Sequence, residues 1–291
     1  MSEREKLIMN GLIIIDKPKD YTSRDVVNIV GKQFKTKKAG HTGTLDPLAT
    51  GVLVVAINDG LKIVNLLGND TKEYIAEVKM GIETDTLDVT GNILKEENNY
   101  ILDKEELKLV LDSFLGRSIQ EVPIYSAVKI NGKKLYEYAR NNEEVELPKK
   151  EIEILEIELL EVSNDSFSFR VVVSKGTYIR SLIRDIGIKL NILCTMSNLR
   201  RTKVGVFSIM DSCKLEELDK TPRIINIEDA LANYNKVKVD SYIENRIKNG
   251  SILENRYNCD IIVFINEEER VIAIYEVYSK DSSKIKPIKV F

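Results

Sequence analysis

The chain has 291 residues, of which 43% are hydrophobic and 31% are charged, with a formal net charge of −3 at pH 7. This length fits one large domain, or a large domain with a small one, and the hydrophobic content is ordinary for a globular protein. No apolar run approaches the roughly 20 residues that a membrane helix needs. The charged start, MSEREKLIMN, lacks the apolar core of a signal peptide. We therefore expect no membrane association.

Cysteine usage argues for a reducing compartment. Cys194, Cys213 and Cys259 are few, odd in number and far apart, which is not the pattern of a disulfide framework. With a single histidine in the chain, a zinc site is also not indicated. We expect a cytoplasmic protein without a metal, and a monomer.

Positive charge gathers in three segments, although the whole chain is slightly acidic. An acidic protein can still present one basic face to a phosphate backbone. Each segment alone is typical of a solvated helix or strand edge, but three around one candidate site favour a nucleic-acid partner. The segments are Lys32, Lys35, Lys37 and Lys38; Lys129, Lys133, Lys134 and Arg140; and Arg170, Lys175, Arg180, Arg184, Lys189, Arg200, Arg201 and Lys203.

The chain begins with a short apolar strand over Gly11–Asp16, which Lys17-Pro18 ends. Thr22 or Ser23 then caps a predicted helix that continues to about Phe34.

The next segment, 40–51, reads GHTGTLDPLATG and leads into an apolar run over 52–57 that is typical of a buried strand. Pro47 disfavours a helical conformation at Asp46 and holds it at a bend. Such a loop can hold one carboxylate in place for chemistry. The plain alternative is turn chemistry, in which His41 caps the turn and Asp46 hydrogen-bonds its own backbone.

Further along, hydrophobic patterns predict alternating strands and helices. A short helix near 61–67 precedes a strand over 72–81, and a polar loop over 83–91 follows. The later elements are a capped helix over 103–116 with Leu107, Val110, Leu111 and Leu115 on one face, a hairpin turn at Asn131-Gly132, strands over 152–162 and 166–173, a helix within 176–190, and short alternating runs over 260–265, 271–277 and 284–291.

Several of these segments resemble motifs of one family. AGHTGTLDPLATGVLVV, at 39–55, is similar to the catalytic loop of the tRNA pseudouridine synthases of the TruB type. The segment QEVPIYSAVK from Gln120 resembles a second family motif, with Val122 at a usual proline, and Leu199-Arg200-Arg201 a third. The KPxGxTS motif has Asp20 at its glycine, and aspartate tolerates the left-handed conformation better than most residues.

The resemblance covers about residues 9–230 and implies an α/β (α+β) architecture. We expect a catalytic domain over 1–230, built around a central mixed, mostly antiparallel sheet. Residues 231–291 resemble the small PUA-type RNA-binding β domain at this family's C-terminus, and an ordinary small β domain is the alternative.

The family's reaction isomerises a uridine in the T-loop of tRNA, at tRNA position 55, to pseudouridine. The N1–C1′ bond breaks and the base rejoins through C5, so no redox cofactor is needed. The resemblance implies that Asp46 is the nucleophile and that Arg180 pairs with it. It places Tyr178 beneath the base and Tyr74 against it, where Tyr74 can take the C5 proton.

The substrate must leave its stack to reach Asp46. The resemblance makes His41 the candidate to fill the vacated space and packs Leu199 at the active site. It places the loop with Asp88 on the RNA side of the cleft. Lys17, Lys37-Lys38 and the 129–140 segment would follow the phosphates of a tRNA T-arm stem-loop.

Two other functions compete with this hypothesis. One is a non-catalytic RNA-binding or tRNA-folding protein that uses the same basic face. The other is a hydrolase with a His41–Ser126 dyad, which the absence of a G-x-S-x-G motif disfavours. The sequence leaves open whether Asp46 first attacks the ribose or the base.

Overall fold

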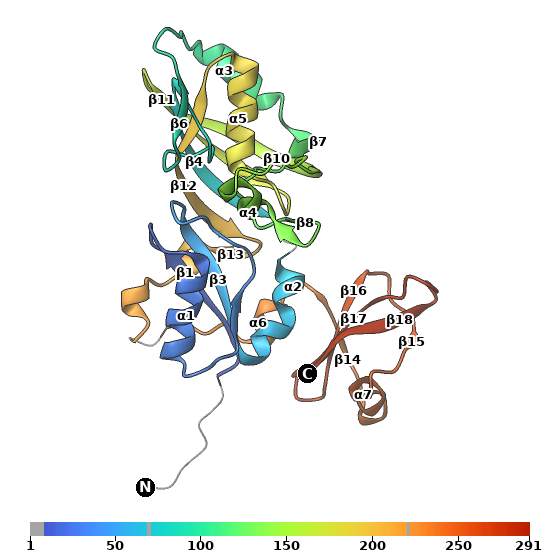
Figure 1. The fold of residues 1–291 in the computed structure, drawn as a ribbon. Coiled ribbons are helices and arrows are strands. Elements are labelled where there is room, and N and C mark those ends of the chain that lie inside the picture. Colours follow the sequence, from blue (N-terminus) through green and yellow to red (C-terminus); the bar gives the residue numbers. More distant parts are fainter. Residues whose placement is uncertain (1–8, 69–70, 220–221) are drawn as a thin grey trace.

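The computed structural model describes residues 9–68, 71–219 and 222–291. An elongated main body carries a nine-stranded sheet, and a lobe at its side carries a five-stranded sheet (Figure 1). The order in the main sheet is β1-β3-β12-β4-β11-β10-β7, with β2 paired to β3 and β13 to β12. Its strands are β1 (Gly11–Lys17), β2 (Ala39–His41), β3 (Thr50–Ile57), β4 (Lys72–Met80), β7 (Gly116–Glu121), β10 (Lys149–Val162), β11 (Ser166–Val173), β12 (Cys194–Val204) and β13 (Phe207–Ser208).

Strand β12 joins the two halves of this sheet. It is antiparallel to β4 along its length, and it meets β3 in parallel only where Arg200 lies opposite Thr50 and Arg201 opposite Gly51. The other pairings in the sheet are antiparallel. The predicted central mixed, mostly antiparallel sheet is therefore confirmed, and its one parallel contact lies beside Leu199.

Helices pack around both sheets, with α7 against the sheet of the side lobe. They are α1 (Ser23–Gln33), α2 (Val64–Leu67) after the 3₁₀ turn η1 (Asn58–Ile63), α3 (Lys104–Asp112), α4 (Leu135–Arg140), α5 (Ile179–Leu190), α6 (Ile227–Ala230) and α7 (Ser241–Lys248), with short 3₁₀ turns η2 (Ile209–Asp211) and η3 (Leu215–Glu217). Thr22 caps α1, since its side chain accepts a hydrogen bond from the Asp25 N–H. The helix predicted over 103–116 is shorter than expected, because α3 ends at Asp112 and Leu115 lies beyond it, half exposed.

One apolar cluster fixes the upper half of the sheet. Ala76, Val78 and Met80 on β4 pack with Leu182 and Ile186 on α5. The alternation along β4 and the helical spacing along α5 put these side chains on matching faces, as their sequence patterns predict. This packing places the start of α5 over the middle of β4 and β12.

Two small hairpins extend from the main body. Strands β5 (Ile82–Thr84) and β6 (Ile93–Glu96) pair with each other, as do β8 (Lys129–Ile130) and β9 (Lys133–Lys134). The β8–β9 turn has positive φ at both Asn131 and Gly132, which is the geometry that an Asn-Gly pair favours. Asp20 also has a positive φ, of 68°, so it adopts the left-handed conformation that glycine favours.

The side lobe is a sheet with the order β14-β16-β17-β18-β15. Its strands are β14 (Asn235–Lys238), β15 (Leu253–Glu254), β16 (Ile261–Ile265), β17 (Val271–Val277) and β18 (Lys284–Val290). The predicted C-terminal β unit is confirmed, and Val263 and Ile274 of the lobe share an apolar cluster with Leu12 and Val54 of the main body. The exact boundary between 230 and 231 stays a prediction. No helix of the described residues is long and apolar enough to span a bilayer.

Candidate active site

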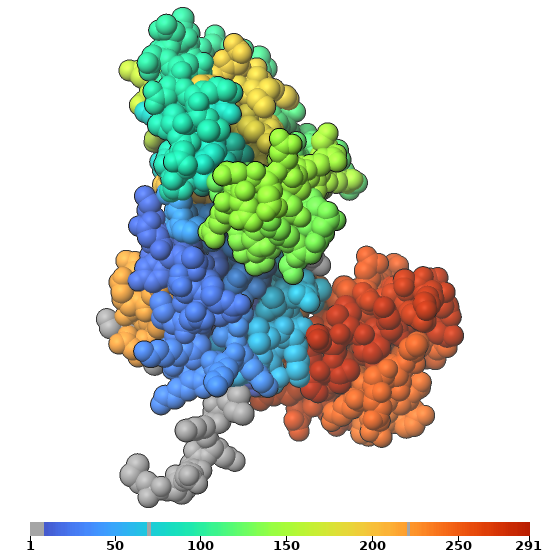
Figure 2. Space-filling model, viewed as in Figure 1, coloured from blue at the N-terminus to red at the C-terminus, as the bar shows by residue number. Residues whose placement is uncertain are grey.

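A cavity of about 470 Å³ opens where the two halves of the main sheet meet. The segment that carries β8, β9 and α4, in light green, lies over this junction (Figure 2). Five residues that the sequence singled out line the cavity together: Asp46, Tyr74, Tyr178, Arg180 and Leu199. Asp46 is the only acidic residue among the described residues that line it. We call this space the Asp46 cavity.

The loop that carries Asp46 is anchored to helix α1. The Ser23 hydroxyl accepts a hydrogen bond from the Leu45 N–H at 2.8 Å and donates one to the Leu45 carbonyl at 3.1 Å. The Asp46 carbonyl accepts from the Ala49 N–H at 3.1 Å, which closes the turn through Pro47. The backbone is therefore fixed on both sides of Asp46, while the Asp46 side chain remains 37% exposed to the cavity.

Arg180 holds the carboxylate from the opposite half of the sheet. Its Nε lies 3.0 Å from the Asp46 Oδ2 atom, and its side chain is only 6% exposed. Its Nη1 donates to the Thr86 carbonyl at 2.9 Å and its Nη2 to the Tyr125 carbonyl at 3.0 Å. The guanidinium is thus fixed by three separate segments, and charge-assisted hydrogen bonds of this kind are the strong ones.

Two tyrosines and a leucine supply the apolar wall. Gln120 holds the backbone of Tyr178, since its Oε1 accepts from the Tyr178 N–H at 2.8 Å and its Nε2 donates to the Tyr178 carbonyl at 3.1 Å. Burial is the main cause that raises the pKa of the Tyr178 phenol, which keeps it neutral. Tyr74 on β4 and Leu199 on β12 come from neighbouring strands. An aromatic face beside a carboxylate suits a flat, uncharged ring.

Sequence reasoning missed the role of Arg201, which it counted with the RNA-facing charges. This side chain is 1% exposed, and its guanidinium donates to the carbonyls of Val52 at 2.7 Å, Gly43 at 3.0 Å and Thr44 at 3.4 Å. The sequence did contain a signal for this burial. Leu199 and Arg201 are two residues apart in a strand, so their side chains lie on the same face of the sheet. Gly51 allows the close approach: it has φ +99°, and a Cβ there would lie 2.1 Å from the Arg201 carbonyl oxygen.

The expectation that Lys17 follows the phosphates is wrong. Its side chain is fully buried, and its Nζ donates to the carbonyls of Pro18 at 2.8 Å, Tyr21 at 2.7 Å and Pro47 at 3.3 Å. Burial lowers the pKa of this ammonium to about 8. Lys17 therefore fastens the 17–21 turn to the Asp46 loop and has no surface to offer RNA.

Asp88 also lies elsewhere than expected. It is buried and does not line the Asp46 cavity; its carboxylate accepts from the Thr90 N–H at 2.9 Å and the Thr86 hydroxyl at 3.0 Å. These bonds stabilise the loop that presents the Thr86 carbonyl to Arg180. Asp88 is a loop-forming residue that acts on the site through Thr86.

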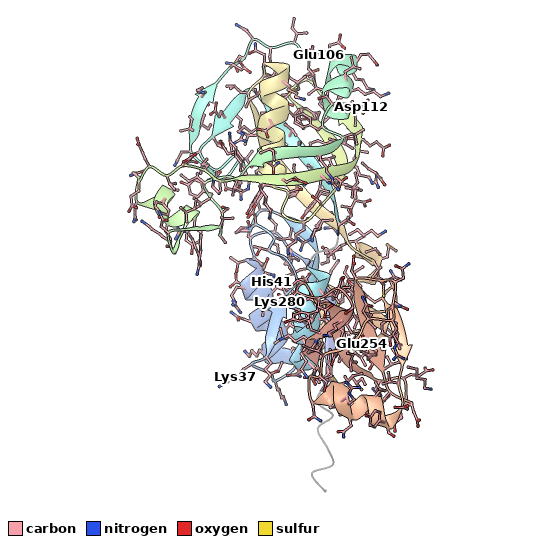
Figure 3. The ribbon with its side chains drawn as sticks, turned by 90° about the vertical axis from the view of Figure 1, so that its right-hand side faces the viewer. Lys37, His41, Glu106, Asp112, Glu254 and Lys280 are labelled. Atoms are coloured by element: carbon pink, nitrogen blue, oxygen red, sulfur yellow. The ribbon has the colours of Figure 1, made fainter. Side chains whose placement is uncertain are left out.

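His41, labelled in Figure 3, ends strand β2. The next residue, Thr42, lines the cavity. Its Nδ1 is buried without a hydrogen-bond partner in the described chain, and burial, followed by the charges of Arg201 and Arg24, lowers its pKa. The Ser126 hydroxyl likewise has no partner among the described residues. The two side chains are not hydrogen-bonded to each other, so the His41–Ser126 dyad is not formed.

The basic cluster over 170–203 is mostly neutralised and does not form a free basic face. Its arginines are paired with carboxylates or buried: Arg170 with Glu73 and Glu156, Arg180 with Asp46, Arg184 with Glu121 and Asp185, Arg200 with Asp16, and Arg201 within the core. Within the described residues there is no group of three or more His, Cys, Asp or Glu side chains arranged to hold a metal ion.

The fold is shared with solved structures of one class of RNA-modifying proteins. A structure of an H/ACA ribonucleoprotein bound to a substrate RNA containing 2′-deoxyuridine matches with a TM-score of 0.71 and 26% identity, covering 97% of this chain and 84% of that chain. A Cbf5-Nop10-Gar1 complex matches with a TM-score of 0.72 and 27% identity, covering 97% of this chain and 83% of that chain.

Sequence comparison identifies the family within this class of proteins. The model of the TruB family pseudouridylate synthase N-terminal domain matches residues 32–179, and that of the tRNA pseudouridylate synthase B C-terminal domain matches residues 180–247. The tRNA pseudouridine synthase B of Clostridium tetani is 45% identical, covering 87% of this chain and 89% of its own. That of Oceanobacillus iheyensis is 43% identical, covering 97% and 98%. The chain belongs to the TruB family of pseudouridylate synthases.

Proposed function

We propose that this protein isomerises uridine to pseudouridine in tRNA, and that its target is the T-loop uridine at tRNA position 55, presented by the T-arm stem-loop. Relatives named tRNA pseudouridine synthase B support the reaction and the substrate class. The observation that carries the proposal is Asp46, the one carboxylate that the described residues bring to the cavity, held 3.0 Å from Arg180 beside two tyrosines. The protein acts as a monomer in the cytoplasm.

Asp46 is the proposed nucleophile. The reaction breaks the N1–C1′ bond, turns the uracil and forms a C5–C1′ bond, so that C5 loses a proton and N1 gains one. No electrons are exchanged with another molecule. Arg180 orients Asp46 and balances its charge, and Tyr74 receives the proton that leaves C5.

The cavity is large enough for one uracil that has left its stack, and Tyr178 offers a neutral face on which the ring can lie. His41 is proposed to occupy the space that the flipped base leaves in the RNA, since its neutral imidazole can stack without added charge. Recognition of a loop by stacking and shape is usual for RNA. Lys37, Lys38 and the 129–140 segment contact the phosphates, and the lobe over 231–291 adds a second RNA contact.

The direct test is a mass-shift assay. A T-arm hairpin is incubated with the purified protein and labelled with a carbodiimide that marks pseudouridine. Labelling at the single T-loop position supports the proposal. A protein that binds the hairpin but leaves all its uridines unchanged would instead be the RNA-binding or tRNA-folding protein of the competing hypothesis.

A further inference from the structure

A second concave surface lies on helix α1, outside the Asp46 cavity. It has a volume of about 510 Å³ and is lined by one face of α1 and the turn that follows it, and none of the described residues in its lining is acidic. We call this surface the α1 groove; its lining residues are Arg24, Val27, Asn28, Gly31, Lys32, Lys35, Thr36, Lys37 and Ala39. The two cavities share no lining residue.

The end of α1 builds the groove. Lys35 adopts a left-handed conformation, with φ 50°, and the Thr36 N–H donates to the Gly31 carbonyl at 2.9 Å. The chain therefore turns back along the helix, and Lys35 and Lys37 come to line the same hollow as Lys32. The absence of a side chain at Gly31 permits this approach, since a Cβ there would lie 2.9 Å from the Thr36 carbonyl oxygen.

The positively charged side chains of the groove are exposed and form no ion pair with a described residue. Arg24, Lys32, Lys35 and Lys37 are each exposed, and none of the four forms an ion pair with a described residue. The arginines of the 170–203 cluster, by contrast, are satisfied within the protein. In a chain of net charge −3, four unpaired cations in one hollow mark a surface suited to an extended anion.

Two stretches of chain connect the groove to the candidate active site. Helix α1 starts where Ser23 holds Leu45, next to Asp46. Its 11 residues span about 16 Å, with Arg24 near that start and Lys32 near the far end. From Lys37 the chain runs through β2 to His41 and then to Thr42 in the Asp46 cavity. Lys37 lies on the side of the molecule from which the β8–β9 hairpin projects (Figure 3), and both α1 and this hairpin face the viewer in Figure 2.

We propose that the α1 groove binds the sugar–phosphate backbone of the substrate RNA, a few nucleotides from the uridine in the Asp46 cavity. The inference rests on the proposed function and extends its Lys37 contact to Arg24, Lys32 and Lys35 in the same groove. A row of flexible, exposed cations over about 16 Å matches successive phosphates on a strand. A single free anion would call for converging, fixed donors, which this hollow does not have.

The test compares two pairs of substitutions that remove the same charge. Lys32→Gln with Lys37→Gln alters the groove, and Lys104→Gln with Lys108→Gln alters exposed lysines on α3, at the far end of the main body. Binding of a full-length tRNA transcript is measured as a function of salt concentration. We expect the groove pair to make the salt slope shallower by about 2 and to weaken binding several-fold at low salt.

The control pair should leave the salt slope unchanged, and thermal melting should show that both variants are folded. An unchanged salt slope, or equal slopes in the two variants, would overturn the proposal. Binding is measured apart from turnover, so failure to form pseudouridine would count against the proposed function and leave this result standing.

Discussion

Arg180 reaches across the junction of the two half-sheets and places its Nε 3.0 Å from the Asp46 Oδ2 atom. The two Nη atoms of the guanidinium donate to the Thr86 and Tyr125 carbonyls, so the arginine is fixed before any substrate arrives. Arg180 therefore fixes the orientation of the Asp46 carboxylate. Preorganisation of this kind favours reaction because little rearrangement is left for the transition state.

Asp46→Asn should abolish pseudouridine formation, with a loss of at least about 10³-fold in kcat, because an amide is a poor nucleophile. Binding of the T-arm hairpin should stay within a few-fold, since the side chain keeps its size. Carbodiimide labelling measures the first quantity and fluorescence anisotropy the second. Turnover that survives in this variant would exclude Asp46 as the nucleophile.

Arg180→Lys should lower kcat by about 10²-fold while the protein stays folded. A lysine keeps the charge but cannot reach Asp46 and hold the Thr86 and Tyr125 carbonyls at the same time. The matched control is Arg184→Lys, one helical turn away, where the arginine pairs with Glu121 and Asp185 outside the cavity. Single-turnover rates should separate the two variants, and equal rates would contradict a positioning role for Arg180.

Arg201→Lys should destabilise the protein by about 3 kcal/mol, because the buried carbonyls of Gly43, Thr44 and Val52 lose donors that lysine cannot replace. The neighbouring Arg200→Lys alters a partly exposed pair with Asp16 and should cost less than about 1 kcal/mol. Urea unfolding monitored by circular dichroism gives both values. The hypothesis fails if the two variants unfold at the same urea concentration.

The pH prediction concerns His41. Burial holds its pKa below the usual 6.5, so in the folded protein the imidazole resists protonation. The unfolded chain then binds more protons below pH 6.5, and the unfolding free energy should fall as the pH drops through that value. His41 is the chain's only histidine, so one imidazole resonance in the NMR spectrum reports the folded pKa directly.

A variant supplies the control for this titration. His41→Asn should lack the part of the pH dependence that arises between 6.5 and the lower, folded pKa. A folded-state resonance that titrates at 6.5 or above would show that the imidazole is not desolvated in the way the geometry indicates.

Patterns between neighbouring residues were enough to locate the local elements and the loop that carries Asp46. Apolar runs and alternation located β1, β3, β4 and β11, the Asn-Gly pair located the β8–β9 turn, and Pro47 marked the bend at Asp46. These features depend on neighbours along the chain, so they can be read without the fold. The motif resemblance added the expected meeting of Asp46 with Arg180, which spacing could not supply.

The role of each positive charge, by contrast, depends on the fold. Lys17 and Arg201 look like surface cations in the sequence, yet both are buried because backbone carbonyls from distant segments converge on them. The register of β12 against β3 brings Arg201 under the Asp46 loop, and the turn after α1 leaves Lys32 and Lys37 unpaired. Charge is a property of one residue, whereas its partner is set by how strands and loops pack.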